Sequence, residues 1–207
     1  IDSYKDSYSP ECISGEKDAC GVGFVANIFG KESNWILAQS LRGLDCMEHR
    51  GGCGGDGDSG DGAGILCSIP WKYLYKELDL NFDKNESKGL GMIFMPDEEK
   101  LIKISQSICD EEAQKLNIKQ TIWRKVPVNR NVLGKLAKSN APYIYQWIVY
   151  PDCTNEKDIE FLLFQLRKRI EKKIREQLSR SEEFYFASLS SKTVVYKGMV
   201  RSEILPQ

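Results

Sequence analysis

The 207-residue sequence lacks an excess of charge of either sign, since 29 lysines and arginines stand against 30 aspartates and glutamates, a formal net charge of -1. Such a balance gives no long-range attraction to phosphate backbones or anionic lipid, so we expect neither a nucleic-acid partner nor a membrane partner. No apolar run approaches the roughly 18–20 residues that cross a bilayer. The stretch Ile1–Lys17 is polar and carries acids, unlike a signal peptide, which predicts an intracellular protein.

Histidine and closely spaced cysteines are scarce as well. His49 is the single histidine, and none of the seven cysteines forms a Cys-x-x-Cys pair. Tetrahedral zinc sites and disulfide frameworks both need several such residues at regular spacing. We therefore expect no metal site and mostly reduced thiols, with a structural role for His49 at the end of a helix.

Enough apolar residues are present for the core of one domain, since 41% of the sequence is hydrophobic and 10% is aromatic. Residues 1–18 are polar and show neither helix nor strand periodicity, which is typical of a leader outside the core. The chain begins with Ile1 rather than methionine, and residues 200–207 directly follow a strand-like segment. We interpret the sequence as an excerpt of a longer protein.

Apolar periodicity predicts strands and helices over most of the remaining chain. Strands are expected at 20–27, 65–69, 91–95, 121–128, 143–150, 183–190 and 193–199, and helices at 33–49, 71–78, 98–116 and 156–180. The last two strands are expected to form a hairpin around the turn 190–192. Residues at strand period two, interpreted as core aromatics rather than base-stacking groups, are Trp123, Trp147, Tyr143 and Tyr145. Neighbouring strands with separate helices favour a layered α+β fold of antiparallel sheets.

The stretch Gly51–Gly64 contains eight glycines and three aspartates in fourteen residues, a composition that no regular element tolerates. A calcium-binding EF-hand loop framed from Asp56 would need an oxygen ligand at Gly60 and a glutamate at Cys67, so calcium binding is not expected. A phosphate loop would join a strand to a helix and would avoid three acids, so nucleotide binding is not expected either. A tight surface turn and the wall of a pocket remain as alternatives.

Cys20 begins the first predicted core strand, which the helix at 33–49 is expected to cover. If the Ala19–Cys20 bond were cut, this residue would carry a thiol nucleophile and a free α-amino group of pKa about 7.7–8, which can take the thiol proton. The simpler role, which the local residues alone favour, is a buried and inert cysteine. The thiols at 46, 53 and 67 match no cluster-ligation spacing and are interpreted as bystanders.

Three stretches of the sequence carry a family resemblance. Asp18–Asn27 reads Asp-Ala-Cys-Gly-Val-Gly-Phe-Val-Ala-Asn, and Cys46–Gly64 begins Cys-Met-Glu-His-Arg-Gly-Gly-Cys. Together with Phe184–Met199, they closely resemble the amino-terminal glutaminase domain of glutamate synthase, and residues 70–180 resemble it more loosely. The stretch that begins at Cys46 looks more like the ferredoxin-dependent enzymes than the pyridine-nucleotide ones.

This resemblance implies a class II glutamine amidotransferase domain of the N-terminal nucleophile hydrolase type, a four-layer αββα sandwich of antiparallel sheets. Residues 1–19 would be a propeptide, and residues 20–207 would be the N-terminal part of the domain, without its C-terminal part. Cys20, with its own α-amino group as the base, would attack the carboxamide of L-glutamine and release ammonia.

The resemblance also implies a pocket loop, cofactors and partners. Arg50, Gly51 and Gly52 would shape the wall of the glutamine pocket. The segment itself would bind no cofactor, whereas its parent enzyme would carry FMN and an iron-sulfur cluster. That parent would combine ammonia with 2-oxoglutarate to make glutamate and would meet ferredoxin through its remaining domains, in the cytoplasm or the plastid stroma.

Two stretches that the family uses to hold the substrate are absent from the sequence. They are His-Ser-Arg-Phe-Ser-Thr-Asn, with its carboxylate-binding arginine, and His-Asn-Gly-Glu, with its oxyanion-hole asparagine. Losing even one oxyanion donor costs about a hundredfold to a thousandfold in turnover, so we expect the 207 residues alone to be essentially inactive. Two alternatives remain open: the glutaminase domain of another class II amidotransferase, and a non-catalytic module of the same fold.

Overall fold

The computed structural model describes residues 21–47, 59–60, 62–81, 83, 86–118, 120–153 and 155–207. Its elements, in chain order and with η for a 3-10 helix, are α2 (Asn34–Cys46), β1 (Ala63–Ser68), α3 (Trp71–Glu77), β2 (Gly89–Met95), α4 (Glu99–Lys115), β3 (Gln120–Lys125), η2 (Arg130–Val132), α5 (Lys135–Ser139), β4 (Tyr143–Tyr150), α6 (Glu156–Gln177), η3 (Ser181–Glu183), β5 (Tyr185–Ser190), β6 (Thr193–Gly198) and η4 (Ser202–Ile204). No helix among the described residues is both long and apolar enough to span a bilayer.

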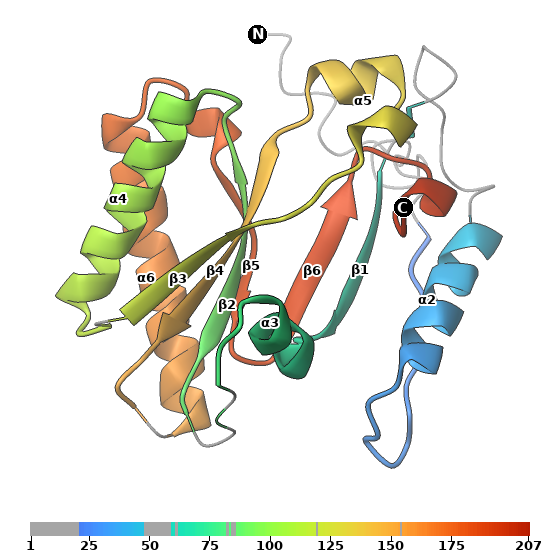
Figure 1. Cartoon of the computed structure of the whole chain (residues 1–207), viewed down its shortest axis with the longest axis horizontal. Helices are drawn as coiled ribbons and strands as arrows, with labels where there is room; N and C mark the ends of the chain where they lie inside the picture. Colours follow the sequence, from blue (N-terminus) through green and yellow to red (C-terminus); the bar gives the residue numbers. More distant parts are fainter. Residues whose placement is uncertain are drawn as a thin grey trace, which may run out of the picture.

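The strands form two antiparallel sheets, and the mixed α+β class predicted from the sequence is confirmed. One sheet has the order β3-β4-β2-β5, and the other pairs β1 with β6. Figure 1 shows the succession in space: α4 with α6, then the four-stranded sheet, then the two-stranded sheet, then α2. The helices α4 and α6 therefore lie on the outer side of one sheet and α2 on the outer side of the other.

The larger core lies between the four-stranded sheet and the helices α4 and α6. Along α6, Leu163, Leu166 and Ile170 recur at helical spacing and are fully buried. Asn155 caps the start of this helix, because its side-chain oxygen accepts a hydrogen bond from the backbone N–H of Lys157 at 3.1 Å. The amphipathic helix predicted at 156–180 is thus present, and its apolar stripe faces the sheet.

Aromatic side chains fill this core across the strands β3 and β4. Trp123 and Trp147 are paired in register and stacked, with ring centroids 5.3 Å apart. A carboxylate on α4 binds both indoles, since Asp110 accepts hydrogen bonds from the Trp123 and Trp147 ring N–H groups, each at 3.1 Å, and from the Thr121 hydroxyl at 2.8 Å. The expectation that the strand aromatics serve the core is confirmed.

A second, smaller core joins the two sheets. Leu90, Met92 and Ile148 point from the other face of the four-stranded sheet towards Val194 of β6 and Leu74 of α3. Strand β2 is therefore buried on both faces, which explains its unbroken apolar sequence.

The predicted hairpin of the last two strands is wrong in its pairing. The turn lies where expected, but the backbone ladder of β5 runs to β2 and that of β6 runs to β1. Serine hydroxyls replace carbonyl acceptors at this corner: Ser188 Oγ accepts from the Val195 N–H at 3.1 Å, and Ser190 Oγ accepts from the Thr193 N–H at 3.2 Å. The chain therefore passes from one sheet to the other within a short turn.

The predicted strand at 20–27 is also wrong in its described part. Residues 21–27 form no strand ladder with any described residue, and Val22 and Phe24 are 93% and 94% exposed. A β-strand exists only where a neighbouring strand accepts and donates its backbone hydrogen bonds. The following helix α2 is present, with Ser33 as its N-cap, but none of its residues is buried.

Candidate functional site

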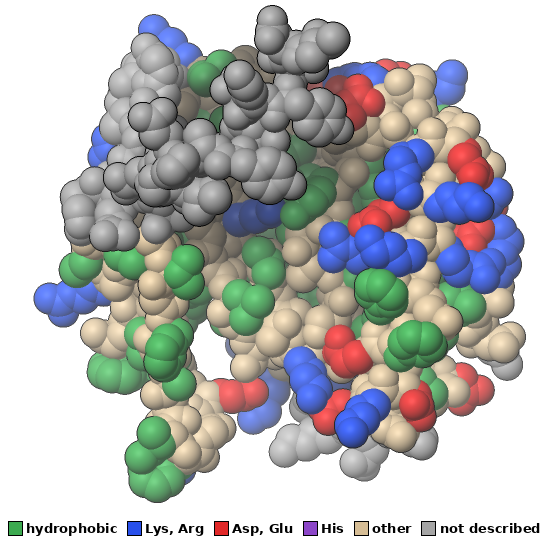
Figure 2. Space-filling model, turned by 180° about the vertical axis from the view of Figure 1, so that it is seen from behind, with side chains coloured by type: hydrophobic (Ala, Val, Ile, Leu, Met, Phe, Trp, Pro, Cys, Tyr) green, Lys and Arg blue, Asp and Glu red, His purple; other side chains and the backbone are tan. Residues whose placement is uncertain are grey.

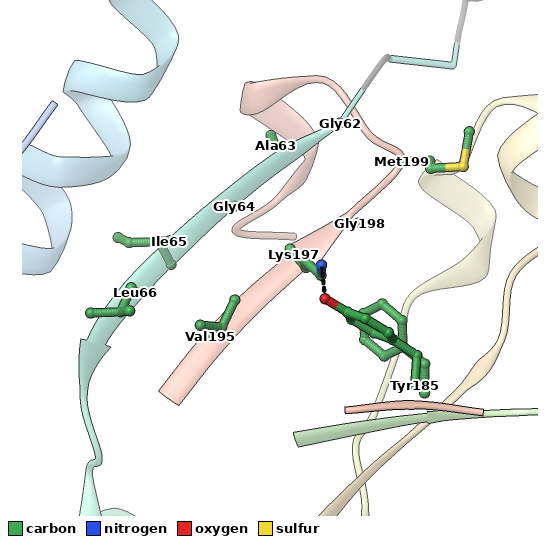
Figure 3. A pocket seen from close by; sticks show the side chains of 11 residues that line it. Gly62, Ala63, Gly64, Ile65, Leu66, Tyr185, Val195, Lys197, Gly198 and Met199 are labelled. Carbon is green, nitrogen blue, oxygen red and sulfur yellow. Dashed lines mark hydrogen bonds between the residues drawn. The ribbon is translucent and has the colours of Figure 1, made fainter. Parts of the chain in front are cut away.

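The structure contains an open cavity of about 560 Å³ between the two-stranded sheet and the end of strands β2 and β5. Its lining residues are Gly62, Ala63, Gly64, Ile65, Leu66, Phe94, Tyr185, Val195, Lys197, Gly198 and Met199. Figure 3 shows these side chains around the pair β1–β6, with Tyr185 reaching across from β5. The walls are mainly apolar, and the polar groups are concentrated at Lys197 and Tyr185.

Glycines allow the chain to form the wall next to β1. Gly62 has a φ of +133°, a conformation that side-chain-bearing residues rarely adopt. Gly64 lies opposite Lys197 in the β1–β6 register, and a Cβ placed on Gly64 would lie 2.9 Å from the Lys197 Cβ. A larger residue at position 64 would therefore displace the lysine that lines the cavity.

Lys197 is the one charged side chain among these lining residues. Its ammonium donates a hydrogen bond to the Tyr185 hydroxyl at 3.0 Å and lies 4.3 Å from the centre of the Tyr185 ring. Phe94 packs against Tyr185, with ring centroids 6.0 Å apart. No described acid forms an ion pair with Lys197, so this cavity presents an ammonium to whatever enters it.

The end of the stretch Gly51–Gly64, called here the glycine-aspartate loop, is anchored beside this cavity. Ser59 is almost fully buried, and its hydroxyl accepts a hydrogen bond from the Ala137 N–H of α5 at 3.1 Å. A Cβ on Gly60 would lie 2.6 Å from the Arg201 backbone nitrogen, so only glycine fits against the segment after β6. The last loop residues thus lead directly into the cavity wall that begins at Gly62.

The predicted site residues lie outside the described residues. These are Cys20, Arg50, Gly51 and Gly52; His49, expected to be structural, and Cys53, interpreted as a bystander, also lie outside them. Two described residues close to them in the sequence, Gly21 and Met47, lie against each other, since a Cβ on Gly21 would lie 3.0 Å from the Met47 sulfur. The structure therefore places the residue after Cys20 against the residue three positions before Arg50.

Two other cysteine thiols, those of Cys67 and Cys109, lie in the described part of the chain and are structural. Burial raises the pKa of the Cys67 thiol and raises that of Cys109 far more, which keeps both protonated and unreactive. No group of three or more metal-ligating side chains occurs among the described residues. The cavity lining likewise supplies no nucleophile or carboxylate from those residues.

A buried lysine elsewhere belongs to the smaller core. Lys88 lies 5.1 Å from the ring centre of Tyr75 and 5.6 Å from that of Trp71, and it donates to the Asp83 carbonyl. Burial lowers its pKa, although nearby acids oppose this shift. The Tyr75 hydroxyl donates a hydrogen bond to that of Tyr150 at 3.0 Å, and both Trp71 and Tyr150 pack against the smaller core.

Comparison with known proteins identifies the class. The sequence profile of the class-II glutamine amidotransferases matches residues 20–207, and the chain belongs to this family. Its relatives include the ferredoxin-dependent glutamate synthases of Pyropia yezoensis, 42% identical over 199 residues, and Arabidopsis thaliana (form 1, chloroplastic/mitochondrial), 43% identical over 202 residues. Ferredoxin-dependent glutamate synthase 2 of Synechocystis is 41% identical over 194 residues.

These alignments cover 92–94% of this chain but 12–13% of the relatives, so the chain spans about an eighth of their length. The resemblance to glutamate synthases, and to their ferredoxin-dependent type, is thereby confirmed.

Sequence reasoning did not single out Lys197 or Tyr185. The available signal was a lone lysine in the otherwise uncharged strand Thr193–Gly198. The predicted hairpin around the turn 190–192 would have set Tyr185 opposite Lys197; in the structure the two side chains meet although β5 and β6 pair with different strands.

Proposed function

We propose that the chain is the glutaminase segment of a glutamate synthase of the ferredoxin-dependent type. The observation that carries this proposal is the family match, which begins at Cys20, together with about 42% identity to such synthases over 94% of the chain. A family boundary at a cysteine is expected if that cysteine becomes the N-terminus of the mature domain.

In the proposed mechanism, removal of residues 1–19 exposes the α-amino group of Cys20. This amine takes the thiol proton, and the thiolate attacks the side-chain carbonyl carbon of L-glutamine. The tetrahedral intermediate collapses when the resulting ammonium returns the proton to the leaving nitrogen, which departs as ammonia. Water then cleaves the γ-glutamyl thioester, which yields glutamate and regenerates the thiol.

The layered arrangement supports the assignment of residues 20–207 to the N-terminal part of an N-terminal nucleophile hydrolase fold. Such a fold stacks two antiparallel sheets between helices as αββα. Figure 1 has the same succession, with α4 and α6 outside one sheet and α2 outside the other.

The cavity supports the role of the glycine-aspartate loop in the glutamine pocket. Gly62, near the end of this loop, lines the cavity, and Gly60 and Ser59 hold the loop beside it. We infer that Arg50, Gly51 and Gly52 form a further part of the same wall.

The parent enzyme is expected to carry FMN and an iron-sulfur cluster on its remaining domains. These groups would supply the electrons with which ammonia and 2-oxoglutarate give a second glutamate. The 207 residues alone should show essentially no glutaminase turnover, because the family's substrate-binding arginine and oxyanion-hole stretches are missing.

The test is to express the full-length parent, determine its mature N-terminus by mass spectrometry and treat it with 6-diazo-5-oxonorleucine, a glutamine analogue. We expect an N-terminus at Cys20 and a single label on that residue. The variant Cys20→Ala should lose labelling and glutaminase activity, whereas Cys46→Ser should keep both because the Cys46 thiol lies on the exposed helix α2.

Retention of the leader, with no label or a label on another cysteine, would make the chain a non-catalytic module of the same fold. A processed and labelled Cys20 in a parent that uses ammonia for a different acceptor would instead assign it to another class II amidotransferase.

A further inference from the structure

The outer side of α6 carries a line of cations and aromatic rings. Along this helix, one set of side chains recurs at spacings of four, three, four, four and three residues, which places the set on one face, opposite to the buried stripe. All six of these residues are exposed. The set, called here the α6 outer stripe, consists of Lys157, Phe161, Phe164, Lys168, Lys172 and Arg175.

Two phenylalanine rings lie uncovered within the α6 outer stripe. Phe161 and Phe164 are 62% and 55% exposed, and they lie three residues apart, so the two rings are neighbours on the helix surface. The Lys168 ammonium lies 5.9 Å from the ring centre of Phe164 and leaves more than half of that side chain in water. Solvent-facing helix positions do not need large aromatic side chains, whereas interfaces are enriched in them. The pair therefore indicates a surface that another polypeptide covers.

The charge of the α6 outer stripe indicates the chemistry of that polypeptide. Lys157 and Arg175 form no ion pair with any acid among the described residues, and Lys168 and Lys172 pair with glutamates of their own helix at 3.0 Å and 3.9 Å. Exposed pairs of this kind are weak and exchange readily for a better partner. Figure 2 shows lysine and arginine side chains gathered on the side of α4 and α6, with hydrophobic side chains among them. The complementary surface is acidic and carries apolar side chains.

The size of the stripe decides between a tethered and a separate partner. Its ends, Lys157 and Arg175, are 18 residues apart, so at about 1.5 Å per residue and about 10 Å of helix width it offers roughly 270 Å². A stable complex between separate proteins buries about 800 Å² on each partner. A surface of about a third of that size holds a partner only at high effective concentration, which another part of the same polypeptide supplies.

The parent polypeptide is also a better occupant than a second copy of the chain. A symmetric dimer through α6 would set the cations of one stripe against those of the other. This chain corresponds to 12–13% of its relatives, so a parent of their length has most of its residues outside these 207. Contacts between the domains of one chain are commonly polar, as this stripe is.

We infer that an acidic segment of the parent polypeptide, outside these 207 residues, docks on the α6 outer stripe and covers Phe161 and Phe164 with apolar side chains. The four-stranded sheet lies between this surface and the cavity, so the docked segment leaves the cavity open. The inference rests on the proposed function only in needing a longer parent of that kind, and it does not need a nucleophile at Cys20.

Lysine acetylation of the full-length parent tests the inference with a matched pair of residues. The side chains of Lys172 on the stripe and Lys103 on α4 are 74% and 71% exposed, and each pairs with a glutamate four residues away. We expect Lys172 to react with a brief pulse of acetic anhydride about tenfold or more slowly than Lys103, because a segment docked in most molecules leaves the amine free only in the rest. Mass spectrometry of the peptides measures both rates.

The comparison is biased against the expected result. The hydrogen bond to Glu99 raises the pKa of Lys103, which lowers its share of free amine and slows its reaction. Equal rates at Lys172 and Lys103, or a faster reaction at Lys172, would overturn the inference.

Photocrosslinking in the same parent identifies the segment. Benzoylphenylalanine in place of Phe164 should give an adduct within one polypeptide, at a rate that does not depend on protein concentration, to a peptide outside residues 1–207 in which acids outnumber bases. The double variant Lys168→Glu, Lys172→Glu should lower the yield about fivefold or more. The control Lys100→Glu, Lys103→Glu on α4 changes the net charge equally and should leave the yield unchanged. An adduct to a second copy, an adduct to a segment without acidic excess, or no adduct would overturn the inference.

Two further outcomes separate this inference from its alternatives. Basic surfaces with aromatic side chains also bind anionic membranes, so protection of Lys172 that occurs only when phosphatidylserine vesicles are added would overturn the inference. Equal acetylation of Lys172 and Lys103 in a parent whose Cys20 is labelled by the glutamine analogue would contradict the docking alone. Slow acetylation of Lys172 without labelling of Cys20 would support the docking and contradict the proposed nucleophile instead.

Discussion

Two halves of the molecule differ in how completely their apolar surfaces are covered. The closed half consists of the four-stranded sheet with α4 and α6, and the open half consists of residues 21–47 with β1 and β6. Leu163, Leu166 and Ile170 of α6 are fully buried, whereas α2 has no buried residue although leucines recur along it. An apolar helical stripe thus predicts that a face needs covering, but it does not predict which part of the polypeptide covers it.

The largest expected contrast between the halves comes from one substitution made in each. Leu166→Ala removes a fully buried side chain and should lower the free energy of unfolding by about 3 kcal/mol. Leu66→Ala changes a side chain that is 63% exposed and should cost less than about 0.5 kcal/mol. Urea unfolding of the 207-residue chain measures both. Equal losses would mean that the open half is already packed in this chain.

Removal of the Asp110 carboxylate, which binds the tryptophan pair, should lower the stability somewhat less. Asp110→Ala leaves the Trp147 and Trp123 ring N–H groups without their acceptor and should cost about 2 kcal/mol. Asp110→Asn keeps one side-chain oxygen and should cost about half as much. Chemical denaturation followed by tryptophan fluorescence distinguishes the two variants, and an undiminished stability of Asp110→Ala would show that water replaces the carboxylate.

Two glycines on β2 provide a matched pair within the closed half. A Cβ on Gly89 would lie 2.7 Å from a methyl carbon of the buried Leu163, so Gly89→Ala should destabilise the chain by about 1–2 kcal/mol. A Cβ on Gly91 would make ordinary contacts at 3.5 Å, so Gly91→Ala should change stability by less than about 0.5 kcal/mol. Thermal unfolding compares them, and the reverse order would contradict the packing of α6 on the sheet.

The smallest expected effect is on the pH dependence of the free energy of unfolding. Burial opposes ionisation of Glu112, but hydrogen bonds from Lys115 and from Arg169 of α6 outweigh it and hold the pKa of this carboxyl below its ordinary value. A lowered folded-state pKa stabilises the fold above the ordinary glutamate pKa of about 4.3, and this contribution is lost as the pH falls through the lowered value.

Glu112→Gln should therefore flatten the dependence of stability on pH below about 4.5, as urea unfolding at several pH values would detect. The exposed pair of Glu99 and Lys103 supplies the control, since Glu99→Gln should change this dependence less. If the unaltered chain and Glu112→Gln showed the same dependence of stability on pH, the ion pair of Glu112 with Arg169 would not stabilise the packing of α4 on α6.

Periodicity in the sequence was sufficient to predict most of the closed half. The strand Tyr143–Tyr150 has the predicted ends, and the helices at 99–115 and 156–177 differ from the predicted ranges by a few residues. These elements are reliable because each has a long apolar pattern and meets its partners within the chain. The short helix α5 was missed, because Lys135–Ser139 has too few residues to show a period.

The open half and the site could be predicted only in part. The run Gly21–Asn27 has strand composition, but a strand also needs a neighbour, and no described residue supplies one. Where β6 passes to a second sheet, the hydroxyls of Ser188 and Ser190 accept backbone hydrogen bonds, a role that the predicted strand at 183–190 and turn at 190–192 did not indicate. The predicted nucleophile at Cys20 and the loop residue Arg50 lie outside the described residues, so their roles remain proposals.

The serine corner between β5 and β6 has a consequence for how the family can diversify. Two hydroxyl groups, rather than a continuous backbone ladder, hold Val195 and Thr193 where the chain changes sheets. These two hydrogen bonds help to hold β6 beside β5, at the side of the cavity that Tyr185 lines. We therefore expect that a single substitution of Ser188 or Ser190 changes the width of this cavity, so that relatives can differ there by one side chain.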